Sequence, residues 1–137
     1  MWTQNEILIP AIRQNRVVIM DRSIISAIVY SQSLGLNPSI LKTLSSLVDT
    51  ELSVFYINTA VDVAYSRKYK IDAFETGMTT ITKRNFFEFQ SIVRNNYSDF
   101  LDGSDFETEY IDNNEESNFD ENFSKILRKI RTSIENN

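Results

Sequence analysis

The sequence predicts an α/β fold in which a mainly parallel sheet is flanked by helices. The first observation is a pair of short runs, residues 17–20 and 52–57, which are almost wholly apolar and rich in β-branched or aromatic side chains. Such runs are typical of strands buried on both faces, as in parallel sheets. The second observation is that a segment with helical spacing of apolar residues follows each run, so that strands and helices alternate along the chain.

The composition indicates a single domain, residues 1–137, because 42% hydrophobic residues can supply a core. A net charge of -5 argues against a broad basic surface for nucleic acid. No apolar run approaches the roughly 20 residues of a membrane helix, and the N-terminus lacks the apolar core of a signal peptide. We therefore expect a soluble cytoplasmic protein with no nucleic-acid or membrane partner.

The sequence contains neither cysteine nor histidine. This excludes a disulfide framework, a thiolate nucleophile, a zinc site of the usual ligands and acid-base chemistry based on histidine. Any catalysis must therefore use carboxylates, arginine, lysine, tyrosine or a bound ion.

The N-terminal half is predicted to contain three helices around the first strand. Apolar spacing over residues 7–12 indicates the first helix, which Pro10 should kink or shorten. The second helix follows the strand and ends at Gly35, a plausible C-cap. The pair Asn37 and Pro38 is a start signal for the third helix.

The C-terminal half begins with the second strand, after which Asn58 and Thr59 are expected to cap a helix that runs to about Arg67. Residues 67–80 then change in character: they are basic at the start, acidic in the middle and contain a glycine. This pattern indicates a mobile loop or a short lid.

The rest of the chain is predicted to form a long helix at 82–101, a weaker strand at 106–111 and a last helix at 119–134. Both helices carry an apolar stripe at spacings of three and four. In the long helix the stripe consists of Phe86, Phe89, Ile92, Val93, Tyr97 and Phe100, and in the last helix of Phe119, Phe123, Ile126, Leu127, Ile130 and Ile134.

The strongest functional candidates on physical grounds are Asp21 and Arg22, which directly follow the first apolar run. In open α/β sheets, ligands bind at the carboxyl ends of the strands. Ser26 and Tyr30 lie four residues apart and share a helix face that looks back towards the charged pair.

The same residues carry a resemblance to thymidylate kinases. The run ILIPAIRQNRVVIMDRSIISAIVY resembles the middle of that family, where an Ile-x-Pro-Ala-Leu helix end leads into a buried strand, Asp-Arg-Tyr or Asp-Arg-His, a Ser or Thr, and Ala-Tyr-Gln. Residues 54–57, 62–67, 72–75 and 86–101 resemble later family segments in the same order. The resemblance therefore covers nearly the whole chain.

The resemblance implies a nucleoside monophosphate kinase of the P-loop fold that transfers the γ-phosphoryl group of ATP to dTMP. This chemistry consists mainly of positioning and charge neutralisation, so it needs no histidine. By position, Asp21 would help to hold Mg2+ and its water, and Arg22 would bind the acceptor phosphate. Ser26 and Tyr30 would line the nucleoside pocket. The lid cations that reach the ATP phosphates or adenine would be Arg67, Lys68 and Lys70.

The sequence departs from the family at several points. It contains no Gly-x-x-x-x-Gly-Lys-Ser/Thr loop, and the upstream arginine that joins Arg22 on the acceptor phosphate is missing. Ser23 stands in place of the family's Tyr or His, Ser31 in place of Gln, and Ala73 in place of a lid Arg. These changes bear on thymine specificity and on the chemistry of the lid.

In this fold the P-loop strand lies between the strands that correspond to residues 16–20 and 52–57, so its absence should leave apolar edges unpaired. We therefore expect an incomplete domain, a C-terminal fragment of a larger protein or a chain that needs a complementing N-terminal segment, and no activity when it is alone. A homodimer is the expected assembly. The alternative is a non-catalytic remnant or interaction protein that keeps the helices for dimerisation.

Overall fold

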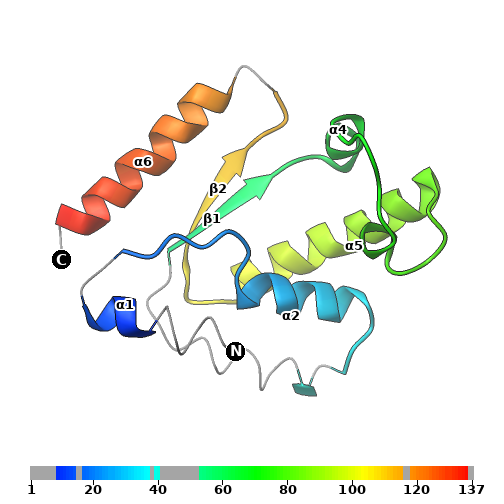
Figure 1. Cartoon of the computed structure of the whole chain (residues 1–137), viewed down its shortest axis with the longest axis horizontal. Helices are drawn as coiled ribbons and strands as arrows, with labels where there is room; N and C mark the ends of the chain where they lie inside the picture. The colour runs from blue at the N-terminus through cyan, green and yellow to red at the C-terminus, as the bar shows by residue number, and fades with distance from the viewer. Residues whose placement is uncertain (1–8, 15–16, 38, 41–52, 116–117, 136–137) are drawn as a thin grey trace.

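The computed structural model describes residues 9–14, 17–37, 39–40, 53–115 and 118–135 (Figure 1). The helices are α1 (Ile9–Arg13), α2 (Ile24–Ser33), α4 (Val61–Ser66), the 3-10 helix η2 (Phe74–Thr76), α5 (Lys83–Asp102) and α6 (Phe119–Glu135). The strands are β1 (Ser53–Asn58) and β2 (Glu107–Asp112).

The sheet of the described residues consists of β1 and β2, which pair in parallel. The register places Ser53 opposite Glu107 and Asn58 opposite Asp112. A parallel pair needs a crossover connection, which here contains α4, η2 and α5. The predicted fold class, a parallel sheet flanked by helices, is confirmed, and the sheet formed by the described residues is small.

Helices cover both faces of this sheet. Successive side chains of a strand point to opposite sides, so alternate residues contact different helices. Val54 and Tyr56 face α2 and α5, and the Tyr56 ring lies 5.4 Å from that of Tyr97 on α5. On the opposite face, Glu107 and Glu109 form ion pairs with lysines of α6. Figure 1 accordingly shows α2 and α5 on one side of the strands and α6 on the other.

The main core lies between α2, α5 and the sheet. A buried aliphatic and aromatic cluster forms its centre, and half-buried tyrosines and phenylalanines surround it. The buried members are Ile25, Val29, Phe89, Val93 and Leu101.

The prediction of a strand at residues 17–20 is wrong. These residues belong to no strand, and Ile19 is 77% exposed. A strand needs a neighbour to satisfy its backbone groups, and within the described residues β1 and β2 pair only with each other. An apolar run without a partner strand therefore stays as an irregular segment leading to α2.

The end of α2 agrees with the prediction, and its start is set by a cap that was not predicted. Ser23 caps the helix by accepting a hydrogen bond from the Ile25 amide at 3.2 Å. The helix ends at Gly35, which has φ 78°. The Gly35 amide donates to the Gln32 carbonyl, and the Leu36 amide donates to the Ser31 carbonyl. This is a Schellman motif, which requires the left-handed conformation that glycine adopts readily.

The third predicted helix starts as expected, because the Asn37 side chain accepts a hydrogen bond from the Ser39 amide at 2.9 Å. Most of this helix, including its apolar stripe after Ile40, lies outside the described residues. So does the first half of the first predicted helix, of which Ile9–Arg13 is described, with Pro10 in this stretch.

The expected cap of α4 is wrong. Ala60 holds the N-cap position without a side-chain hydrogen bond, and its amide donates to the side chain of Asn114 at 2.7 Å. Asn58 and Thr59 instead accept hydrogen bonds from Arg94 and Asn113. Side chains that appeared suited to local capping thus connect β1 with α5 and with the loop after β2.

The two C-terminal helices match their predicted limits within one residue. Thr82 caps α5. Within the predicted stripe of this helix, Phe86, Phe89 and Val93 are buried, Tyr97 and Phe100 are half-buried, and Ile92 is exposed. In α6 the stripe is only partly covered, since Phe119 is 66% exposed and Phe123 and Ile134 are also exposed. Among the described residues, none of the helices has both the length and the apolar character that a membrane span requires.

Candidate functional site

Asp21 and Arg22 form a bend between residues 17–20 and α2. Both are exposed, and they lie at the start of a helix and not, as predicted, at the end of a strand. Arg22 has φ 58°, a left-handed conformation that non-glycine residues rarely adopt. Its guanidinium carbon lies 5.5 Å from the centroid of the Tyr30 ring, within the range of a cation-π contact.

The Tyr30 ring is the centre of an aromatic cluster. It stacks on Phe74 of η2 at a centroid distance of 5.2 Å and an interplanar angle of 13°, and lies 6.2 Å from Phe89 of α5. Arg22 and Phe74 therefore both contact the Tyr30 ring, and we call these three residues the Arg22 stack. The stack joins the Asp-Arg pair to residues 72–75, two segments that are far apart in the sequence.

Ser26 is close to the stack but is already bound. The hydroxyl of Tyr97 donates to Ser26 Oγ at 2.7 Å, which links α5 to α2. Burial raises the pKa of Tyr97, so its phenol stays protonated at neutral pH and can continue to donate.

Residues 72–77 are packed against α5. The Glu75 amide donates to Asp72 Oδ1 and the Asp72 amide donates to Glu75 Oε2, each at 3.1 Å. Thr76 is buried, and a Cβ on Gly77 would lie 2.7 Å from the Phe89 ring. The mobile loop or lid that the sequence predicts is therefore held at its centre by hydrogen bonds and by close packing.

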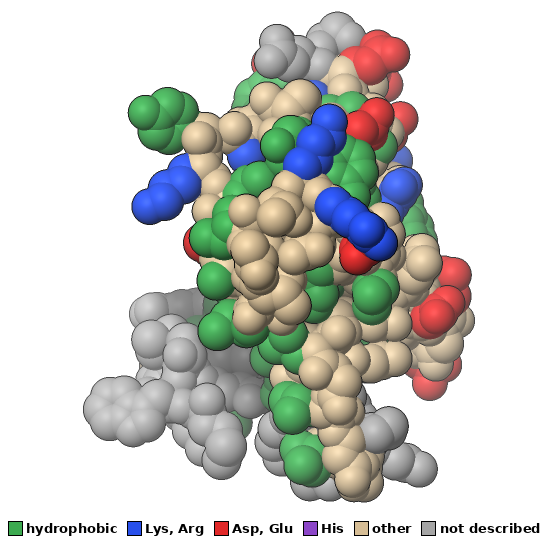
Figure 2. Space-filling view, turned by 90° about the vertical axis from the view of Figure 1, so that its right-hand side faces the viewer, with side chains coloured by type: hydrophobic (Ala, Val, Ile, Leu, Met, Phe, Trp, Pro, Cys, Tyr) green, Lys and Arg blue, Asp and Glu red, His purple; other side chains and the backbone are tan. Residues whose placement is uncertain are grey.

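The predicted lid cations Arg67, Lys68 and Lys70 are all exposed. Figure 2 shows several Lys and Arg side chains on the face of the molecule that it displays. The Arg67 guanidinium donates to the carbonyls of Asn113 at 2.6 Å and Asn114 at 3.1 Å. Lys68 forms an ion pair with Glu75. Lys70 is exposed on the loop. Arg67 thus connects the end of α4 to the loop after β2, and Lys68 connects it to η2.

A pocket of about 160 Å³ lies at the carboxyl end of β1, between α2, α4 and α5. Its polar lining includes Arg94, whose Nε donates to Asn58 Oδ1 at 3.1 Å. Sequence reasoning predicted Tyr30 but missed Arg94. Arg94 follows Val93 but lies outside the predicted apolar stripe, so the local sequence does not single it out. The described lining residues are Tyr30, Tyr56, Ile57, Thr59, Val61, Ala64, Gln90, Val93, Arg94 and Tyr97.

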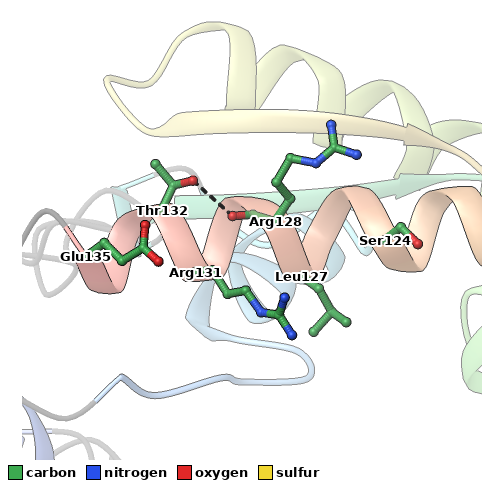
Figure 3. A pocket seen from close by; sticks show the side chains of 6 residues that line it. All are labelled: Ser124, Leu127, Arg128, Arg131, Thr132 and Glu135. Atoms are coloured by element: carbon green, nitrogen blue, oxygen red, sulfur yellow. Dashed lines mark hydrogen bonds between the residues drawn. The ribbon is translucent and has the colours of Figure 1, made fainter.

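A groove on α6 is the other hollow of interest, and none of the predicted site residues lines it. Figure 3 shows its side chains along a single helix, where the Thr132 hydroxyl donates to the Arg128 carbonyl at 3.1 Å. The described lining residues are Ser124, Leu127, Arg128, Arg131, Thr132 and Glu135. Its position apart from the Arg22 stack gives it no role in the predicted chemistry.

The acidic residues offer few ligands for a metal ion. Among the described residues, no group of three or more Asp, Glu, His or Cys side chains is placed to hold one. Asp21 supplies a single carboxylate. This donor set suits Mg2+ when nucleotide phosphates and water complete its octahedral shell, which is the usual arrangement for this ion.

A family model described as thymidylate kinase matches residues 1–126 of the 137-residue chain. No curated protein and no solved structure matches the chain.

Proposed function

The chain belongs to the thymidylate kinase family, and on this premise we propose that it forms the acceptor-nucleotide part of a dTMP kinase. The family assignment supports a nucleotide kinase-type phosphotransferase. The parallel strands between helices agree with an incomplete P-loop kinase fold. The proposed reaction is transfer of the γ-phosphoryl group of ATP to dTMP, with dTDP as the product.

The observation that carries this proposal is the Arg22 stack. It brings together the Asp-Arg pair and the segment that resembles the family's Asp-Arg-Phe-Glu, although about 50 residues separate them in the sequence. The planar guanidinium of Arg22 can bind two oxygens of the acceptor phosphate at once. The Tyr30 ring beneath it would hold the guanidinium at the entrance of the nucleoside pocket, and Ser26 would line that pocket.

The other groups would act on the phosphates of both nucleotides. Asp21 would hold Mg2+ through water, and the ion would neutralise charge on the phosphoryl group during transfer. Arg67, Lys68 and Lys70 would bind ATP from the lid side. For Arg67 and Lys68 this requires an exchange of their present partners, the carbonyls after β2 and Glu75, for phosphate oxygens or adenine.

Phosphoryl transfer also needs a group that holds the ATP phosphates from the other side. The sequence contains no Gly-x-x-x-x-Gly-Lys-Ser/Thr motif, whose amides and lysine perform this task in P-loop enzymes. We therefore propose that the chain is inactive by itself and becomes active when a segment that carries a P-loop is supplied.

The second candidate is an interaction protein that keeps the fold without the catalysis. It is favoured by the exposed apolar side chains of α6, where the Phe119 and Phe123 rings stack at 6.3 Å. A second copy of the chain could cover this face.

The test measures dTMP binding by the purified chain with isothermal titration calorimetry. We expect saturable binding that Arg22→Gln weakens roughly 10-fold or more, since charge-assisted hydrogen bonds contribute about 1.5–3 kcal/mol. The matched control is Arg84→Gln, an exposed arginine of α5 whose ion pair with Glu88 is remote from the stack. Equal dTMP affinity in the wild-type chain and the Arg22 variant would remove Arg22 from the acceptor site.

The activity test adds a separately expressed P-loop segment from a thymidylate kinase and follows ATP-dependent formation of dTDP. Activity only in the presence of that segment would support the proposed kinase part. Turnover of dTMP by the chain alone would contradict the dependence on a P-loop. Absence of dTMP binding together with a concentration-dependent dimer would favour the interaction protein.

A further inference from the structure

We propose that Arg94 and the pocket at the carboxyl end of β1 form a second anion-binding site, which takes a phosphate group. The site differs from the acceptor position assigned to Arg22, and its existence does not depend on kinase activity. Its ligand class follows from the charge, the hydrogen-bond donors and the size of the pocket.

The first argument is the state of the Arg94 guanidinium. It is half-buried, and its described protein partner is the neutral amide oxygen of Asn58, which binds Nε. Within the described residues, the ion pairs involve Lys68, Arg84, Lys125 and Lys129, and no carboxylate pairs with Arg94. A partly buried charge without a counterion is unfavourable, because the lost hydration is not replaced. A bound anion would supply the missing partner.

The second argument is the geometry of the guanidinium. The hydrogen bond from Nε to Asn58 fixes the plane of the fork, and the described residues accept no hydrogen bond from the two terminal nitrogens. A guanidinium with a fixed plane can bind two phosphate oxygens with little further loss of side-chain entropy.

The third argument is the lining of the pocket. It includes the hydroxyl groups of Tyr56 and Thr59, and no Asp or Glu is among its described lining residues. Thr59 Oγ1 accepts from the Asn113 side chain, so its own proton remains available for a ligand. A cation next to hydroxyl donors, without a carboxylate to repel the ligand, is suited to an oxyanion.

The fourth argument is place and size. The pocket lies at the carboxyl end of a parallel strand, which is where α/β sheets bind ligands. Its volume of about 160 Å³ is smaller than the roughly 300–1,000 Å³ of sites for drug-sized ligands, so it suits a phosphate group and not a whole nucleoside. That phosphate can be free, or it can be one end of a nucleotide whose remainder passes Tyr30, which lines the same pocket.

The test titrates the full chain with inorganic phosphate by isothermal titration calorimetry and repeats the titration with dTMP and with acetate. We expect saturable phosphate binding that Arg94→Gln weakens roughly 10-fold. Arg94→Lys should weaken it less, because it keeps the charge but loses the fork. Arg84→Gln is the matched control on the same helix and should leave phosphate binding unchanged.

The outcomes separate this site from the acceptor site. Loss of phosphate binding in Arg94→Gln with dTMP affinity unchanged supports a site for a free anion, and loss of both supports a nucleotide phosphate as the ligand. No saturable phosphate binding by the wild-type chain, equal binding by Arg94→Gln, or acetate binding as tight as phosphate would overturn the proposal. Circular dichroism checks the fold. If Arg94→Gln does not fold, the lysine variant decides, and wild-type phosphate affinity in that variant overturns the proposal.

Discussion

Residues 17–20 and residues 72–77 each lie beside the Arg22 stack, but only the second segment is fixed by its contacts. The first is apolar and exposed, and within the described residues it belongs to no strand. The second is more polar, yet it contains the buried Thr76, the reciprocal hydrogen bonds of Asp72 and Glu75, and Gly77 against the Phe89 ring.

Partner surfaces, and not apolar character, therefore determine which of the two segments is packed. An apolar run gains stability only when another surface covers it. In the second segment, the amides of Asp72 and Glu75 are hydrogen-bonded within the segment, and Gly77 packs against the buried Phe89 ring. Residues 72–77 are therefore held by α5, whereas Asp21 and Arg22 depend on Ser23, the N-cap of α2, and on the contact between Arg22 and Tyr30.

The largest effect should come from a change at the ring that holds the second segment. Phe89 is 6% exposed and contacts both Gly77 and Tyr30, so we expect Phe89→Ala to lower the free energy of unfolding by about 3–5 kcal/mol. The matched change in the first segment is Ile19→Ala, which should stay within about 0.5 kcal/mol. Urea denaturation followed by circular dichroism measures both. A similar loss in both variants would mean that residues 17–20 are as well packed as η2.

A smaller effect is expected from a comparison of two glycines that both have positive φ. Gly77→Ala combines the left-handed strain with overlap of the new Cβ and the Phe89 ring, so we expect a loss of about 2–4 kcal/mol. Gly35→Ala meets no atom within 4 Å and should cost about 1–2 kcal/mol from strain alone. The same urea experiment measures the difference, and equal losses would show that Gly77 is not in close contact with α5.

The hydrogen bond between Tyr97 and Ser26 should have a still smaller effect. Tyr97→Phe removes the donor that links α5 to α2, and we expect a loss of about 1 kcal/mol in the free energy of unfolding. Tyr69→Phe is the control, because this side chain is fully exposed. Thermal unfolding compares the two variants, and no difference between them would make the link between the helices energetically neutral.

The smallest effect concerns the ion pairs between α6 and the outer face of the sheet. Hydrogen bonds from Lys129 and Ser53 lower the pKa of Glu107. The hydrogen bond between Lys129 and Glu107 also raises the pKa of Lys129. The unfolded chain takes up a proton at Glu107 at a higher pH than the folded one. The carboxylate therefore stabilises the fold above roughly pH 4, and this contribution is lost as the pH falls further.

This pH dependence can be measured by thermal unfolding between neutral and acidic pH, with Glu107→Gln for comparison. The wild-type chain should lose slightly more stability on acidification than the variant, and the difference should shrink at high salt because both groups are exposed. A larger acid loss in the variant would reverse the sign and contradict the role of this ion pair.

The local signals in the sequence predicted much of the fold. Helical spacing and caps placed α2, α5 and α6, and the apolar or alternating runs placed β1 and β2. These elements follow from interactions between near neighbours in the chain, such as the Ser23 cap and the Schellman motif at Gly35, so their limits could be read without a tertiary structure.

The candidate site was predictable only in part. The motif order singled out Arg22 and Tyr30, and these residues do meet. The partners that complete the site, Phe74, Arg94 and Tyr97, come from segments 40 or more residues away, and nothing in their local sequence indicates the contact. The prediction that failed at Asn58 has the same cause, because a side chain suited to a local cap found a distant partner.

The sequence by itself thus determined the type and limits of most elements and the family to which the chain belongs. Only the tertiary structure decided that residues 17–20 form no strand within the described chain, that residues 72–77 are packed on α5, and that Arg94 faces a pocket. The physical reason is that backbone hydrogen bonds and caps act over a few residues, whereas strand pairing and burial need a partner surface that a single segment does not contain.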